Sequence, residues 1–274
     1  MKNGFGFAED IVPFLHELFP DLSDGNKVLV AVLYSALFLF FILIARVLLK
    51  IISNHIAKKA FKIYLSSLNI LKDINDLEIS EEEKKSLRDL ISVCAKLGAD
   101  IDFHTDRINH SRKVSRLVSK MCTFLRVPKL EGILNTCASM IYDIGFLDID
   151  AELFQAEILD QKEKQLLKTH INSFLPESDF IPEAYKTLFV FAINYHHENF
   201  DGSGYPEGLK EKDIPSVARM IRAAESYVSM TSKRSYHKTL SREKAIKNLK
   251  KAGVYDMEIV GALEHVTKNI RGKK

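Results

Sequence analysis

Residues 196–206 read HHENFDGSGYP and contain both the end of an expected helix and the first part of a turn-rich loop. Upstream of this stretch, Pro182 suits the first turn of a helix that we expect to reach His197. Downstream, the loop 199–213 has glycine or proline at positions 202, 204, 206 and 208. Burying two adjacent histidines costs desolvation unless each finds a partner. His196 and His197 are therefore the strongest candidate ligands that spacing alone provides.

Helical patterning continues on both sides of this stretch. Capping-box pairs at Ser80–Glu83 and Asp160–Glu163 support two of the helix starts. We find no alternating strand pattern and no internal repeat. The sequence therefore predicts an all-α fold. In the part of the chain that follows residue 80, we expect helices over about 80–98, 102–125, 129–142, 160–174, 182–197, 215–232, 241–251 and 256–269.

The composition is that of an ordinary globular chain. Hydrophobic residues make up 46%, and 39 Lys and Arg stand against 36 Asp and Glu, for a net charge of +3. This balance argues against disorder and against bulk electrostatic binding of nucleic acid. The cysteines at positions 94, 122 and 137 form no CxxC pair, so we expect buried, reduced thiols.

One segment near the N-terminus departs from this average. Residues 28–45, VLVAVLYSALFLFFILIA, contain no charge, and a helix of that length covers roughly 27 Å. A buried core helix or a cleaved signal peptide could share this composition, but a buried helix rarely lacks a polar stripe for so long. Acidic residues precede the segment and no Ala-x-Ala site follows it. We predict a transmembrane helix over 28–49, an extracytoplasmic segment 1–27 and a juxtamembrane helical linker 50–98.

Flanking charges predict the orientation of this helix. Residues 1–26 hold one Lys and five acidic residues, whereas residues 46–62 hold five basic residues and no acidic one. By the positive-inside rule, everything after the segment lies in the cytoplasm of a single-pass inner (cytoplasmic) membrane protein. The basic cluster should favour anionic membrane lipid. Small residues within 28–45 would let two copies of this helix pack closely, so a homodimer stays an open alternative.

Carboxylates and imidazoles recur on the other expected helices. Asp106 and His110 are four residues apart and would share one helix face. Asp143 follows a helix end, His170 lies late in its helix, and Glu225 lies inside the helix after the loop. Mixed sets of this kind, drawn from separate helices, are how bundles hold Fe, Mn or Zn. Two metals bridged by a carboxylate would activate a water for attack on a phosphoester.

Residues 196–206 resemble the HHExxDGxGYP signature of HD-GYP domains. That family is an all-helical branch of the HD metal-dependent phosphohydrolases and hydrolyses cyclic di-GMP. The resemblance covers about residues 100–266 and extends to Ile214-Pro215, Ala218-Arg219 and the segment 233–236. It implies an HD-type helical bundle over 99–270. It also implies cyclic di-GMP as ligand, and a diguanylate cyclase partner that would contact the GYP loop.

The resemblance also implies roles for individual residues. Two divalent transition metals, Fe or Mn, are expected, with Asp143 as the bridging and catalytic carboxylate. One metal would be held by His110, Asp143 and Glu225, and the other by Asp143, His170, His196 and His197. Asp106 stands where some members hold a third metal. The residues expected to contact the dinucleotide are Tyr205, Arg234 and His237, although Arg234 could equally be part of a solvated basic run.

Three positions depart from the family pattern. Tyr142 replaces the histidine of the His-Asp doublet, Phe146 replaces a lysine, and Glu225 stands where an aspartate is usual. Two functions are therefore open. One is a membrane-anchored phosphodiesterase that opens cyclic di-GMP to a linear dinucleotide or GMP. The other is a degenerate domain that serves as a cyclic di-GMP receptor or protein-interaction module without turnover.

Overall fold

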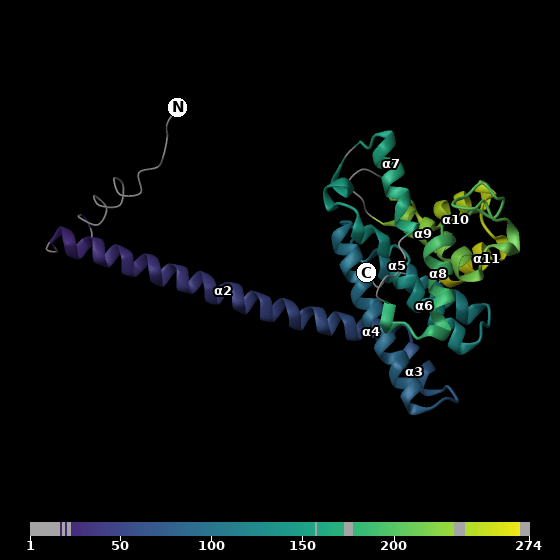
Figure 1. Ribbon diagram of the computed structural model, residues 1–274, viewed down its shortest axis with the longest axis horizontal. Coiled ribbons are helices and arrows are strands. Elements are labelled where there is room, and N and C mark those ends of the chain that lie inside the picture. Colours follow the sequence, from purple (N-terminus) through teal and green to yellow (C-terminus); the bar gives the residue numbers. More distant parts are fainter. Residues whose placement is uncertain are drawn as a thin grey trace. The chain divides into compact units, whose positions relative to one another are not determined.

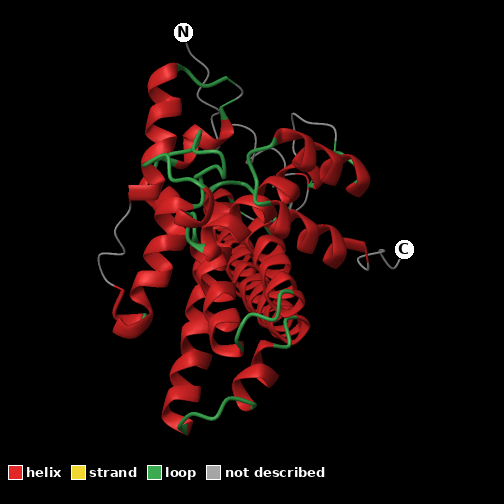
Figure 2. Ribbon diagram, turned by 90° about the vertical axis from the view of Figure 1, so that its right-hand side faces the viewer, coloured by secondary structure: helices red, strands yellow, loops and turns green. Residues whose placement is uncertain are grey.

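The computed structural model describes residues 17, 20, 23–156, 158–172, 178–232 and 239–268. Within these residues the secondary structure is entirely helical (Figure 2), which confirms the predicted all-α class. The chain divides into two compact units, residues 1–62 and 63–274. The predicted boundary at residue 99 stays a prediction.

Most of the described part of the first unit belongs to one long helix, α2 (Asp24–Ser67, 44 residues), which continues past residue 62 (Figure 1). Its section Val32–Lys50 is long and apolar enough to cross a membrane, and none of it is buried within the protein. Large apolar side chains such as Leu33, Phe38 and Leu49 are exposed there. The helix runs without a break through the predicted span 28–49 and into the predicted linker.

The second unit is a bundle whose core comes from apolar helix faces. Helix α5 (His110–Phe124) packs against α6 (Lys129–Ile141) and α9 (Ser216–Thr231), and α4 (Glu81–His104) packs against α6. The remaining described elements are α3 (Ile70–Asn75), η1 (Ile144–Asp148), η2 (Ala151–Gln155), α7 (Gln161–Lys168), η3 (Thr169–Asn172), η4 (Ser178–Phe180), η5 (Glu183–Tyr185), α8 (Lys186–Tyr195), η6 (Glu211–Asp213), α10 (Arg242–Ala252) and α11 (Met257–Lys268). All three cysteines are free and buried, as predicted.

Two predicted helix boundaries are wrong in the same region. Helix α4 does not end near Gly98 but continues to His104, and no helix spans 102–125. Asp106 and Asn109 have φ values of 51° and 55°, which a right-handed helix excludes, so the chain turns over residues 105–109. The turn is fastened by Asp102, whose carboxylate accepts hydrogen bonds from the Ser111 amide at 2.9 Å and hydroxyl at 2.8 Å.

The elements that carry the histidines begin and end close to the predicted positions. Both capping boxes form, at Ser80–Glu83 before α4 and at Asp160–Glu163 before α7. The segment expected as one helix over 182–197 consists of the short η5 followed by α8, with the two histidines directly after its end. The sequence patterns therefore identify most helices of the bundle, but not how its helices are joined around residue 106.

Candidate metal centre

Four potential metal ligands meet inside the bundle. Asp143 follows α6, His170 lies in η3, and His196 and His197 follow α8. One ligand atom from each residue lies within 4.8 Å of the others. These four residues are the set that the resemblance to HD-GYP domains implies for one of the two metals, with Asp143 as the bridge to the other.

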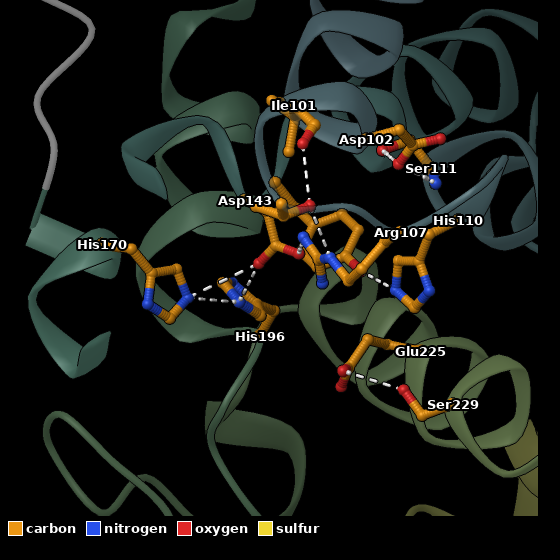
Figure 3. A network of polar contacts seen from close by, with 12 residues as sticks. Ile101, Asp102, Arg107, His110, Ser111, Asp143, His170, His196, Glu225 and Ser229 are labelled. Atoms are coloured by element: carbon orange, nitrogen blue, oxygen red, sulfur yellow. Dashed lines mark hydrogen bonds and ion pairs between the residues drawn. The ribbon is translucent and has the colours of Figure 1, made fainter. Parts of the chain in front are cut away.

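The ligand atoms face one another closely. The Nε2 atom of His170 lies 3.3 Å from Nε2 of His196 and 3.2 Å from Nε2 of His197. Asp143 Oδ1 is 3.5 Å from Nε2 of His170 and 3.4 Å from Nε2 of His196 (Figure 3). Four donor atoms therefore converge on one small volume.

Backbone carbonyls determine which ring nitrogen of each histidine carries the proton. Nδ1 of His170 lies 2.5 Å from the Leu167 carbonyl, and Nδ1 of His196 lies 2.8 Å from the Ile193 carbonyl. A carbonyl only accepts, so each Nδ1 donates and each neutral ring presents an Nε2 lone pair to the cluster. These lone pairs and the Asp143 carboxylate share no proton, and a bound cation would satisfy them together. The donor set fits a metal.

The surroundings of His170, His197 and Asp143 keep these three groups in the protonation states that a metal requires. Burial lowers the pKa of His170 to about 4 and the pKa of His197 to about 2. Burial would raise the pKa of Asp143, but the Arg107 guanidinium outweighs burial and holds that pKa well below the usual range. Neutral imidazoles beside an ionised carboxylate suit Zn, Fe or Mn.

Two aromatic rings flank the cluster. The Phe146 ring stacks on His170 with centroids 4.1 Å apart, and the Tyr205 ring stacks on His197 at 4.8 Å. Tyr205 belongs to the loop that the sequence identified, and the structure places it directly beside the candidate ligands. Lys168 Nζ lies 5.1 Å from the centroid of the same ring.

The loop that carries Tyr205 is held by contacts with the residues that follow the two histidines. The buried Glu198 accepts hydrogen bonds from the amides of Glu207 at 2.7 Å and Gly208 at 3.0 Å. At Gly204 the backbones approach so closely that an added Cβ would lie 2.2 Å from the Asn199 nitrogen. Glycine at this position is therefore a requirement of the fold.

Comparison with known proteins shows the family of this chain. A protein-family model described as HD domain matches residues 94–259, more than half of the chain. This chain belongs to the HD domain family. The signature at residues 196–206 and its phosphodiesterase relatives place the chain in the HD-GYP branch.

Three of the relatives that it matches are phosphodiesterases. A cyclic di-GMP phosphodiesterase of Thermotoga maritima is 26% identical over 229 residues, which cover 80% of this chain and 62% of that protein. The cyclic di-GMP phosphodiesterase response regulator RpfG of Xanthomonas campestris is 25% identical over 189 residues, or 68% of this chain and 48% of RpfG. The 3'3'-cGAMP-specific phosphodiesterase 3 of Vibrio cholerae is 27% identical over 138 residues, or 50% of this chain and 30% of that enzyme.

This HD-GYP chain thus spans less than two thirds of the length of each of these relatives. Among solved structures, the HDGYP protein Bd1817 of Bdellovibrio bacteriovorus matches with a TM-score of 0.49 and 16% identity. That match covers 77% of this chain and 80% of Bd1817.

The other ligand set expected of an HD-GYP domain is not brought together. His110 Nε2 lies 2.9 Å from the hydroxyl of Tyr142, the residue that replaces the usual histidine. Glu225 accepts a hydrogen bond from Ser229 at 3.4 Å and lies 3.8 Å from Arg222. Across the described ranges, only the cluster around Asp143 brings three or more His, Cys, Asp or Glu ligand atoms together.

Asp106, the residue expected at a third metal, is exposed in the turn between α4 and α5 and is not part of the cluster. The sequence placed it on one helix face with His110, and the break at residues 105–109 removes that relationship. Arg234 and His237, two of the three residues expected to contact the dinucleotide, lie outside the described residues.

Sequence reasoning missed Arg107. Its Nη2 donates to Asp143 Oδ2 over 2.7 Å, and its Nε donates to the Thr105 hydroxyl at 2.9 Å. Its guanidinium also lies over the Phe146 ring, 5.1 Å from the centroid. A buried Asp143 implies a counter-charge, but nothing in the local sequence distinguishes Arg107 from the other basic residues of the chain.

Proposed function

We propose that this HD-GYP chain is a metal-dependent phosphodiesterase that hydrolyses cyclic di-GMP to a linear dinucleotide or GMP. The observation that carries the proposal is the convergence of three imidazoles and one carboxylate beside the Tyr205 loop. The names of the relatives support cyclic dinucleotides as the substrate class. Mn or Fe is the metal that we propose for this donor set.

The chain's own residues have separable tasks in this proposal. A divalent metal, when bound, polarises a phosphoryl oxygen and lowers the pKa of a water molecule. Asp143 Oδ1 and the three histidines would hold the metal, and the carbonyls of Leu167 and Ile193 keep two of the rings in the ligating orientation. Arg107 fixes the other oxygen of Asp143 and so sets the direction of its carboxylate.

Substrate contacts come from the loop and from the segment that follows α9. Tyr205 presents an aromatic ring next to the metal ligands, where a base or ribose of a bound dinucleotide would lie. Arg234 offers a planar fork for a phosphate, and His237 a second polar contact. Both of these assignments rest on the resemblance to HD-GYP domains.

A second function is favoured by a specific observation. The Tyr142 hydroxyl lies at hydrogen-bond distance from Nε2 of His110, and the uncharged ring of Phe146 stacks on one face of His170. Both residues lie where the chemistry would occur. A domain that binds cyclic di-GMP or a protein partner without turnover is therefore the alternative.

We also propose that α2 anchors the domain in the inner membrane, with the N-terminus outside. In support, Val32–Lys50 is apolar and unburied, and five basic residues lie within 46–62. Anionic lipid headgroups are the contact that these basic residues favour. The homodimer and the diguanylate cyclase contact stay predictions.

The deciding experiment is a turnover assay on the full chain in detergent. Metal-free protein would be reloaded with Mn²⁺ or Fe²⁺ and incubated with cyclic di-GMP or 3'3'-cGAMP, and the nucleotides separated by chromatography. We expect a linear product from the loaded wild type and none from His197→Ala or from chelator-treated protein. Intact substrate together with tight calorimetric binding would refute the enzyme and support the receptor.

A further inference from the structure

The two oxygens of Asp143 face different partners. Oδ1 faces the Nε2 atoms of His170 and His196, whereas Oδ2 accepts the hydrogen bond from Arg107 Nη2 at 2.7 Å. A carboxylate that bridges two metals gives one oxygen to each. In this chain the second oxygen is occupied by a guanidinium.

Arg107 is held firmly in that position. Its side chain is only 17% exposed, and the Asp143 side chain is 5% exposed. The Thr105 hydroxyl accepts from Nε and in turn donates to the Ile101 carbonyl at 2.8 Å, so the guanidinium is tied back to the end of α4. In Figure 3 the Arg107 side chain is seen between Asp143 and His110, with Glu225 nearby.

The neighbouring groups are also poorly arranged to receive a metal. Tyr142 is almost completely buried, and its hydroxyl lies at hydrogen-bond distance from the nitrogen that His110 would need for coordination. A divalent ion at this position would lie close to a guanidinium that cannot lose its proton. Like charges repel strongly in so dry a site.

We propose that Arg107 acts as a fixed cation in place of a second metal, so that the domain binds a single divalent ion, between Asp143 Oδ1 and the three histidines. The inference deepens the proposed function and rests on it. It assigns Arg107 a positioning role, because the side chain acts through the orientation and charge of Asp143.

The test is the metal content of the full chain in detergent, stripped with a chelator, reloaded with Mn²⁺ and freed of excess ion. Elemental analysis should give one Mn²⁺ per chain, and electron paramagnetic resonance should show an isolated ion without exchange coupling. Arg107→Met combined with Tyr142→His should double the Mn²⁺ content per chain and introduce exchange coupling between the two ions. Arg107→Lys should keep one ion, because it retains the charge. Arg88→Met is the matched control. Arg88 lies early in α4 and donates a hydrogen bond to Asn75, so this variant should also keep one ion.

Each outcome has a distinct meaning. Two ions in the wild type would overturn the role of Arg107 and leave the proposed function standing, whereas no ion would refute the metal-dependent function itself. A folded double variant that still holds one ion would show that Arg107 is not what excludes the second. If circular dichroism shows that the double variant does not fold, the wild-type content and resonance spectrum decide the question.

Discussion

The Nε2 atoms of His170 and His196 lie 3.3 Å apart, although both rings direct their protonated Nδ1 atoms to backbone carbonyls. Two lone pairs therefore face each other beside the ionised Asp143, an arrangement that a bound cation stabilises. Metal binding and stability should for this reason be coupled in this domain.

Mn²⁺ should raise the thermal stability of the chain. A ligand that binds only the folded state at 100 times its Kd contributes about 2.7 kcal/mol. We expect this gain in a melting experiment with and without chelator, and its loss in His197→Ala, which removes one of the converging nitrogens. An equal rise in melting temperature in that variant would place the bound metal elsewhere.

Gly204→Ala should distort the Tyr205 loop. The new Cβ would lie 2.2 Å from the Asn199 nitrogen and 2.5 Å from the Glu198 Cα, both of them backbone atoms. We expect a loss of about 2 kcal/mol in the free energy of unfolding and weaker nucleotide binding by calorimetry. Gly261→Ala in α11 is the control, because nothing lies within 4 Å of its added Cβ. It should leave the chain as stable as before or more so, since alanine favours a helix.

Tyr142→Phe should remove one buried hydrogen bond and nothing else from the core. The lost bond to His110 should cost roughly 1 kcal/mol in urea unfolding. Tyr195→Phe is the matched control, because its bond to Glu207 is exposed and should contribute less. The Mn²⁺ content should not change in either variant. A fall in metal content of Tyr142→Phe would make the phenol a ligand.

Asp256 should make stability depend on pH in the acidic range. Burial favours its protonated form, but the bond from Arg219, the Glu258 amide and Lys212 outweigh burial and lower the pKa. The stabilisation that Asp256 contributes to the folded state is therefore fully present above the ordinary aspartate pKa of about 4. It is lost as the pH falls through the lower pKa that Asp256 has in the folded state. Asp256→Asn should cost about 3 kcal/mol at neutral pH, and less as the medium becomes acidic. A pH-independent difference in unfolding free energy would contradict this.

Charges placed in α2 should release the chain from membranes. Leu37 and Phe41 are both exposed in the apolar section of α2, and each arginine at the centre of a membrane helix costs about 3 kcal/mol. We expect Leu37→Arg with Phe41→Arg to move the chain from the membrane fraction to the soluble one on centrifugation. Phe103→Arg, at an even more exposed apolar position of the second unit, should change nothing. Retention of the double variant would argue against α2 as the anchor.

Much of the candidate centre is readable from local patterns. His196 and His197 are adjacent and Tyr205 follows within one loop, so a motif could identify them before any packing was known. Asp143 and His170 are assigned through the resemblance that this motif carries. The failures lie at Asp106 and His110. Their spacing of four implies a shared helix face only while the helix continues, and the positive φ of Asp106 ends that relationship.

The sequence alone determined the helical class, the capping boxes and the adjacent pair His196-His197, because these depend on periodicity and on side chains within a few residues of one another. Asp143 and His170 are assigned to the same site only through the resemblance to HD-GYP domains, and the packing of the bundle brings them to the two histidines. The tertiary structure alone decided that Arg107 neutralises Asp143, 36 positions further along the chain, and that Tyr142 contacts His110, 32 positions before it. The physical reason is that a buried charge requires a partner but does not specify which one. Only the packing of the turn after α4 against the end of α6 makes that choice.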